Sequence, residues 1–171
     1  MNTAWNDSFA SAALNALNAW LRFHGNAGDI RGVAVDVDGL YGSGGMYLVT
    51  HDEWSSLPAK RRNSPGDWQH STHWDLNSEF SRAFLDSWSP VEHFVSTGID
   101  LRSSEAADRI WDDLLVAASN GLHAVLNMLV DSYGVDETLL FYVVLEHDEP
   151  SCETATRMAR FLAARSERPP T

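Results

Sequence analysis

Residues 139–146 read LLFYVVLE and form the longest unbroken apolar run in the chain. Its β-branched and aromatic side chains favour a strand over a helix. A strand without polar alternation has both faces covered, so we expect a central strand with helices packed on its faces. The other elements should therefore assemble around this strand.

Helical spacing of apolar side chains, with capping residues at the ends, predicts helices before and after this strand. They cover residues 8–24, 51–57, 78–87, 90–95 and 104–133, followed by a last helix opened by Asp148 and Pro150. The short helix after residue 50 starts with a capping box formed by Thr50 and Glu53. In the longest helix, Asn120 followed by Gly121 predicts a kink or a split, and Gly134 predicts its end.

Three further strands are predicted upstream of the apolar run. In residues 32–38 valines alternate with Ala and Asp, as in a strand with one face exposed to solvent. Residues 46–50 are predicted to form its antiparallel hairpin partner, and residues 68–75 a short third strand. This order predicts an α+β fold: one domain over residues 1–171, with a mixed or mainly antiparallel sheet of three to five strands and helices packed against it. Residues 58–67 are expected to be an exposed loop, and residues 166–171, with paired prolines, a frayed tail.

The chain is strongly acidic, with 12 basic and 24 acidic side chains and a net charge of −12. Nucleic acids and anionic membranes need a positive face, so neither is an expected partner. A basic protein partner suits this charge, although solubility alone would also explain it.

Three features predict a cytoplasmic protein. No apolar run approaches the roughly 18 residues that cross a bilayer, and the N-terminus lacks the pattern of a signal peptide. Cys152 is the single cysteine, which excludes an intrachain disulfide.

Two acidic pairs are candidate partner-binding residues, as parts of an acidic surface. Asp36 and Asp38 should both point outward at a strand end, as in a magnesium-binding Asp-x-Asp pair or as ordinary residues before a glycine turn. Magnesium enzymes with an Asp-x-Asp pair have a Thr or Ser after the pair and further lysines, and this chain lacks both. The interpretation as ordinary residues before a turn is therefore favoured. Glu146 and Asp148 end the apolar strand, where binding sites often form, but acids there also suit a helix start.

Histidines supply the candidate metal ligands. His70, His73 and Asp75, joined by His51 or His147, could hold zinc or iron, because imidazole and carboxylate suit these metals. His70 and His73 share a face only on a helix; on a strand they point to opposite sides. No His-Glu-x-x-His pattern and no complete phosphate loop is present, so we expect no cofactor unless the histidines converge.

Four tryptophans fall among polar residues in the middle of the chain: Trp54, Trp68, Trp74 and Trp88. Aromatic side chains in polar surroundings are typical of contact surfaces, where they would bind a partner or form a homodimer. Alternatively, they close a small core from its edge.

Residues 88–93 (WSPVEH), placed after a hairpin and a polar middle, and the apolar strand ending in acids at 146–149 resemble an uncharacterised bacterial family, domain of unknown function 4303. The resemblance spans about residues 33–149; the histidines at 70 and 73 and the glycine-rich hairpin depart from it. Some members lie beside polymorphic toxin genes, which implies an immunity-type role and no catalytic residues.

Two functions therefore stand as hypotheses. The preferred one is a non-enzymatic bacterial protein-binding module, of immunity type, that neutralises a basic toxin partner. The alternative is a small metal-dependent hydrolase that uses the His/Asp cluster.

Overall fold

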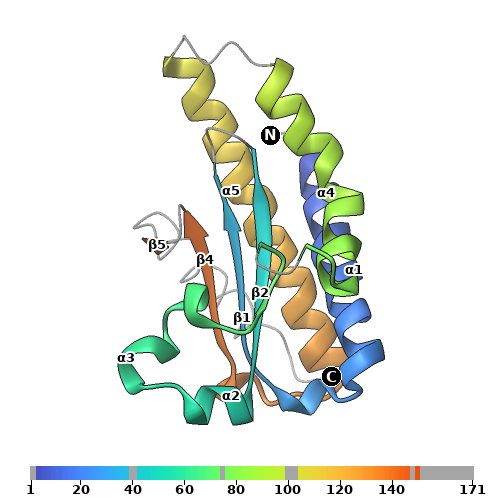
Figure 1. Ribbon diagram of the computed structural model, residues 1–171. Coiled ribbons are helices and arrows are strands. Elements are labelled where there is room, and N and C mark those ends of the chain that lie inside the picture. Colours follow the sequence, from blue (N-terminus) through green and yellow to red (C-terminus); the bar gives the residue numbers. More distant parts are fainter. Residues whose placement is uncertain (1–2, 39–41, 74–75, 99–103, 147–148, 151–171) are drawn as a thin grey trace, which may run out of the picture.

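A sheet with three long helices on one face makes up the fold (Figure 1). The structure is a computed structural model that describes residues 3–38, 42–73, 76–98, 104–146 and 149–150. Its main elements are α1 (Thr3–His24), β1 (Ile30–Val37), β2 (Gly44–Thr50), α2 (His51–Ser56), α3 (Ala59–Arg62), β3 (His70–Ser71), α4 (Glu79–Gly98), α5 (Ser104–Asn127), β4 (Phe141–Glu146) and β5 (Glu149–Pro150). Short 3-10 segments are η1 (Ala27–Asp29), η2 (Pro65–Asp67) and η4 (Glu137–Leu139), and a π-helical turn, η3 (Met128–Ser132), extends α5. The predicted single-domain α+β fold is confirmed.

The sheet is mixed, with strand order β3-β2-β1-β4-β5. β1 pairs antiparallel with β2, as the predicted hairpin required, and parallel with β4. The central strand is thus β1, and the expectation that the apolar run 139–146 lies at the centre is wrong. Beyond β4 the described sheet continues only with the two residues of β5. The segment 141–145 contains no polar residue because both of its faces are covered. Val144 packs under the helices, and Phe141 and Val143 pack on the opposite face of the sheet.

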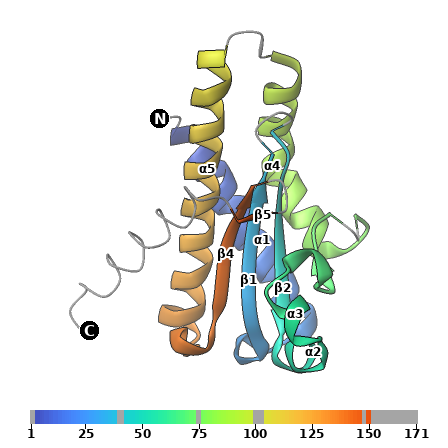
Figure 2. The same ribbon diagram turned by 90° about the vertical axis from the view of Figure 1, so that its left-hand side faces the viewer.

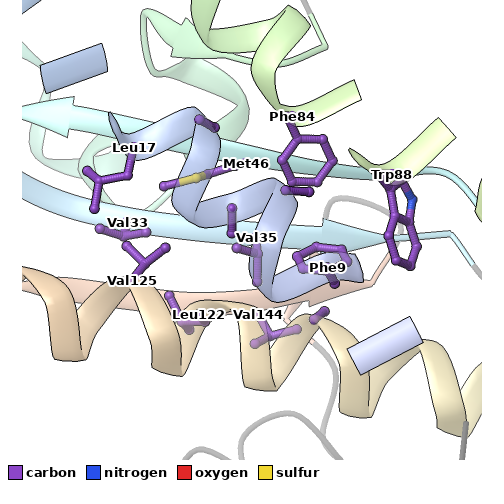
Figure 3. Close-up of a cluster of buried hydrophobic side chains, with 14 of the residues drawn as sticks. Phe9, Leu17, Val33, Val35, Met46, Phe84, Trp88, Leu122, Val125 and Val144 are labelled. Carbon is purple, nitrogen blue, oxygen red and sulfur yellow. The ribbon is translucent and has the colours of Figure 1, made fainter. Parts of the chain in front are cut away.

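The main core lies between the sheet and the helix layer, where α1 packs against both α4 and α5 (Figures 1 and 2). Phe9 of α1 meets Phe84 and Trp88 of α4 edge to face, with ring centroids 5.4 and 4.8 Å apart (Figure 3). The predicted alternative of a split at Gly121 is wrong, since α5 runs through it. A Cβ at Gly121 would overlap the Phe9 ring, so glycine brings α1 and α5 close together.

α4 is one helix, where the sequence predicted two, and Pro90 lies inside it. A proline in a helix interior costs about 3 kcal/mol. The buried stripe of Phe84, Trp88 and Val95 continues across the proline, and each such side chain contributes about 1.5–3 kcal/mol on burial. Burial therefore outweighs the missing hydrogen bond.

The opposite face of the sheet is also covered, so the prediction of one wet face on residues 32–38 is wrong. A second buried cluster gathers there: Ala34, Tyr47, Val49, Trp68 and Leu145. Trp68 is held by its indole N–H, which donates to the Arg62 carbonyl at 3.0 Å. The prediction of an exposed loop at residues 58–67 is partly wrong. Most of these residues are exposed, but the segment includes α3 and η2, and Pro65 is buried.

Predictions for the segments around the last strand have mixed outcomes. Gly134 ends the helix in a left-handed conformation (φ 69°), and Thr50 caps α2 by accepting from the Glu53 N–H at 3.2 Å, both as predicted. The predicted helix start at Asp148 and Pro150 is wrong at Glu149–Pro150, which pair as a strand with Leu145 and Glu146. The remainder of that helix and the tail at 166–171 lie outside the described residues.

The helical stretch Asp108–Ser132 is long and apolar enough to cross a membrane by length and composition alone, and half of its most apolar window is buried in the protein. Core helices pass the same test.

Candidate functional site

Asp36 and Asp38, predicted to share an outward face, do not form an open carboxylate pair. Asp36 is buried on the second face of β1, where its Oδ1 lies 2.9 Å from His73 Nε2 and its Oδ2 accepts from the Tyr47 hydroxyl at 3.2 Å. Asp38 follows β1, and its backbone exchanges hydrogen bonds with the hairpin turn through Ser43 and Gly42. The arrangement is that of a strand end entering a turn, rather than a magnesium site.

Gly45 makes the Asp36–His73 contact possible. It lies opposite Asp36 on β2. A Cβ at this position would overlap His73 Nε2 and would lie 2.6 Å from Asp36 Oδ1. The ring of His73 therefore occupies the space that a side chain would fill, and it ties the segment after β3 to the sheet.

His70 and His73 lie on opposite faces of the sheet, as expected for a strand. His73 meets Asp36 and Tyr47 on the second face, whereas His70 lies 4.9 Å from His24 and 5.6 Å from Trp20 on the helix side, measured between ring centroids. His51 is partly buried at the start of α2. Among the residues whose positions are described, no group of three His, Cys, Asp or Glu side chains could hold a metal. Asp75 and His147, the remaining members of the predicted cluster, lie outside the described residues.

A cavity of about 440 Å³ opens between the end of α1, β3 and the start of α4. Its walls are aromatic, imidazole and polar side chains: Trp20, Phe23, His24, Gln69, His70, Ser71, Ser78, Glu79 and Phe80. The sequence did not reveal this cavity, because Trp20 and His24 lie at helical spacing with Phe9, Ala13 and Leu17 and so resemble core residues of α1.

The two histidines of the cavity are arranged around Trp20. His24 stacks on the indole, with ring centroids 4.6 Å apart and planes 19° apart. Burial, and then the neighbouring His24, lower the pKa of His70 below its usual value. Both effects disfavour the protonated form of His70.

The tryptophans predicted for a contact surface have different positions. Trp68 and Trp88 are buried, so neither belongs to such a surface, and the core interpretation holds for both. The Trp88 N–H donates to the Gly42 carbonyl at 3.0 Å. Trp54 is partly buried under Arg31, whose guanidinium carbon lies 4.8 Å from the ring centroid. Trp74 lies outside the described residues.

Five large apolar side chains stay exposed within the described part of the chain: Phe23, Leu76, Phe94, Tyr133 and Leu139. Phe23 and Tyr133 flank the end of α1, where Tyr133 also lines a shallow hollow with Arg22 and Gly25. Figures 1 and 2 place the end of α1 and the turn from α5 into β4 at the same end of the molecule. We call this the α1-end surface; it contains the exposed residues Arg22, Phe23, Asp29, Asp131, Tyr133, Asp136 and Leu139, of which three are acidic and one is basic.

Glu146, the other acid predicted at the strand end, closes β4 opposite Val37. Asp148 lies outside the described residues.

The chain matches no protein-family model, no curated protein and no solved structure.

Proposed function

We propose that the protein is a non-enzymatic, cytoplasmic bacterial module that binds and neutralises a basic toxin partner, in the manner of an immunity protein. The α1-end surface carries this proposal, because it combines exposed apolar side chains with acids in a chain of net charge −12. Interfaces commonly join an aromatic anchor to a polar rim. Here Tyr133 is the anchor, and Asp131 and Asp136 belong to the rim.

The backbone around Tyr133 is ordered by its own hydrogen bonds. The Gly134 N–H donates to Val130 O at 3.1 Å, and the Val135 N–H donates to Leu129 O at 3.0 Å. Asp136 accepts from the Thr138 N–H at 3.0 Å and from its hydroxyl at 2.8 Å, which lowers the pKa of Asp136 and keeps it ionised. An ordered surface loses less conformational freedom on binding.

The charge of the chain supports a basic partner. Acids on the surface would accelerate encounter with a positive protein and make the association sensitive to salt. The metal-dependent hydrolase is not supported in the same way, because His70 and His73 lie on opposite faces of the sheet.

The experiment is to identify the genes adjacent to this one and to co-express the protein with any adjacent gene product that is basic and toxic to the cell, scored by cell growth. We expect the wild-type protein to protect the cell, and the double variant Tyr133→Ser with Asp136→Asn to protect much less. The matched control is Phe94→Ser with Asp86→Asn on α4, which removes one exposed ring and one exposed carboxylate elsewhere. Equal loss in both variants, no protection by the wild type, or stoichiometric metal in the purified protein would overturn the proposal.

A further inference from the structure

We infer that the cavity between α1, β3 and α4 binds a guanidinium side chain, an arginine of the basic partner. The inference rests on the proposed function, because it assigns one side chain of that partner to one site. It is carried by the composition of the cavity walls, which is independent of the α1-end acids.

The cavity walls suit a cation. Phe23, which is 69% exposed, supplies an accessible aromatic ring, and Glu79 supplies a carboxylate. Trp20 and Phe80 form the buried part of the wall. Guanidinium groups stack on aromatic faces and bind carboxylates with two parallel hydrogen bonds. None of the described residues lining the cavity is Lys or Arg. The volume of about 440 Å³ lies within the range of ligand pockets, roughly 300–1,000 Å³.

Glu79 is accessible to such a cation. Its present ion pair is with Arg82, one turn further along α4, at 3.5 Å. Both side chains are more than half exposed, at 53% and 56%. Exposed pairs of this kind are weak, so an incoming guanidinium can share or replace Arg82 as the partner of Glu79.

His70 makes the site dependent on pH. His24 from α1 lies 4.9 Å from His70 of β3, measured between ring centroids, and Glu79 of α4, which pairs with Arg82, lines the same cavity. A neutral His70 tolerates a guanidinium, whereas a protonated His70 would repel it. Acidification should therefore release the cation.

The probe for the experiment is N-acetyl-arginine amide, titrated into the full-length protein and followed by NMR. The uncharged citrulline analogue is the ligand control. We expect the arginine amide to bind weakly and specifically, to bind about five- to tenfold more weakly after Glu79→Gln or Phe23→Ala, and to bind more weakly at pH 5.5 than at pH 7.5. Asp86→Asn and Phe94→Ala, on exposed positions of α4, should leave its affinity unchanged.

Three results would each overturn the inference. They are equal binding of the citrulline analogue, equal effects of Glu79→Gln and Asp86→Asn, and binding that strengthens in acid. The two proposals can also fail separately. Toxin protection that persists in the Glu79→Gln variant, together with no binding of the arginine amide, removes the cavity and leaves the immunity function. Specific binding of arginine amide without protection removes the immunity function.

Discussion

Substituting Gly45 by alanine should destabilise the protein through a contact on the second face of the sheet. The new methyl group would overlap His73 Nε2 and crowd Asp36 Oδ1. Because both neighbouring strands fix the backbone of β2, the imidazole must move away. Asp36, which is 8% exposed, would then keep only the Tyr47 hydroxyl of the two partners described above.

The magnitude follows from what is lost. A hydrogen bond to a charged group contributes about 1.5–3 kcal/mol, and overpacking costs about 1–3 kcal/mol when it is not relieved by movement. Alanine recovers about 0.5–1 kcal/mol over glycine, because it loses less backbone entropy on folding. We therefore expect Gly45→Ala to lower the free energy of unfolding by about 2–3 kcal/mol.

Urea unfolding at neutral pH measures this change, and a double-mutant cycle tests its cause. In a His73→Ala background the overlap with the imidazole and the Asp36–His73 hydrogen bond are already gone, and only the crowding of Asp36 Oδ1 remains. Gly45→Ala should therefore cost less than about 1 kcal/mol there. The reasoning is refuted if Gly45→Ala lies within about 0.5 kcal/mol of the wild type. It is equally refuted if the substitution costs the same with and without His73.

Three other outcomes are expected. Gly121→Ala should cost about 1–2 kcal/mol in urea unfolding, because its methyl group meets the Phe9 ring and helix propensity offsets only part of the overpacking; an unchanged midpoint would contradict this. Trp88→Phe should cost about 2 kcal/mol, since the buried Gly42 carbonyl loses its donor; a loss below about 0.5 kcal/mol would show that this bond contributes little. As pH falls through 6.5, the unfolded chain protonates at His70 before the folded protein does, so the wild type should lose more stability between about pH 8 and pH 5.5 than His70→Gln; identical pH profiles would exclude this linkage.

Local signals in the sequence predicted local structure well. The hairpin of residues 32–50, the cap at Thr50 and the stop at Gly134 each depend on a few neighbouring residues, and each is confirmed. The identity of the central strand was beyond such signals. An unbroken apolar run shows that both faces of a strand are covered, but it does not show how many strands lie beside it.

The sites depended on contacts between distant segments, which explains why the sequence did not reveal them. His24 meets His70, and Asp36 meets His73, only because β3 crosses to the edge of the hairpin. The predictions at Gly121 and Pro90 failed for a related reason. Each residue locally favours the end of a helix, but packing against α1 or the sheet keeps the helix continuous.

The position of β1 at the middle of the sheet has a consequence for synthesis on the ribosome. Its hairpin partner β2 emerges soon after it, but its parallel partner β4 emerges only after both α4 and α5. Until then the apolar surfaces of α1 and β1 lack part of their native packing partners. Contacts between segments so far apart in the sequence slow folding. The nascent chain must therefore carry its first helix and hairpin incompletely packed until nearly all of the described fold has been translated.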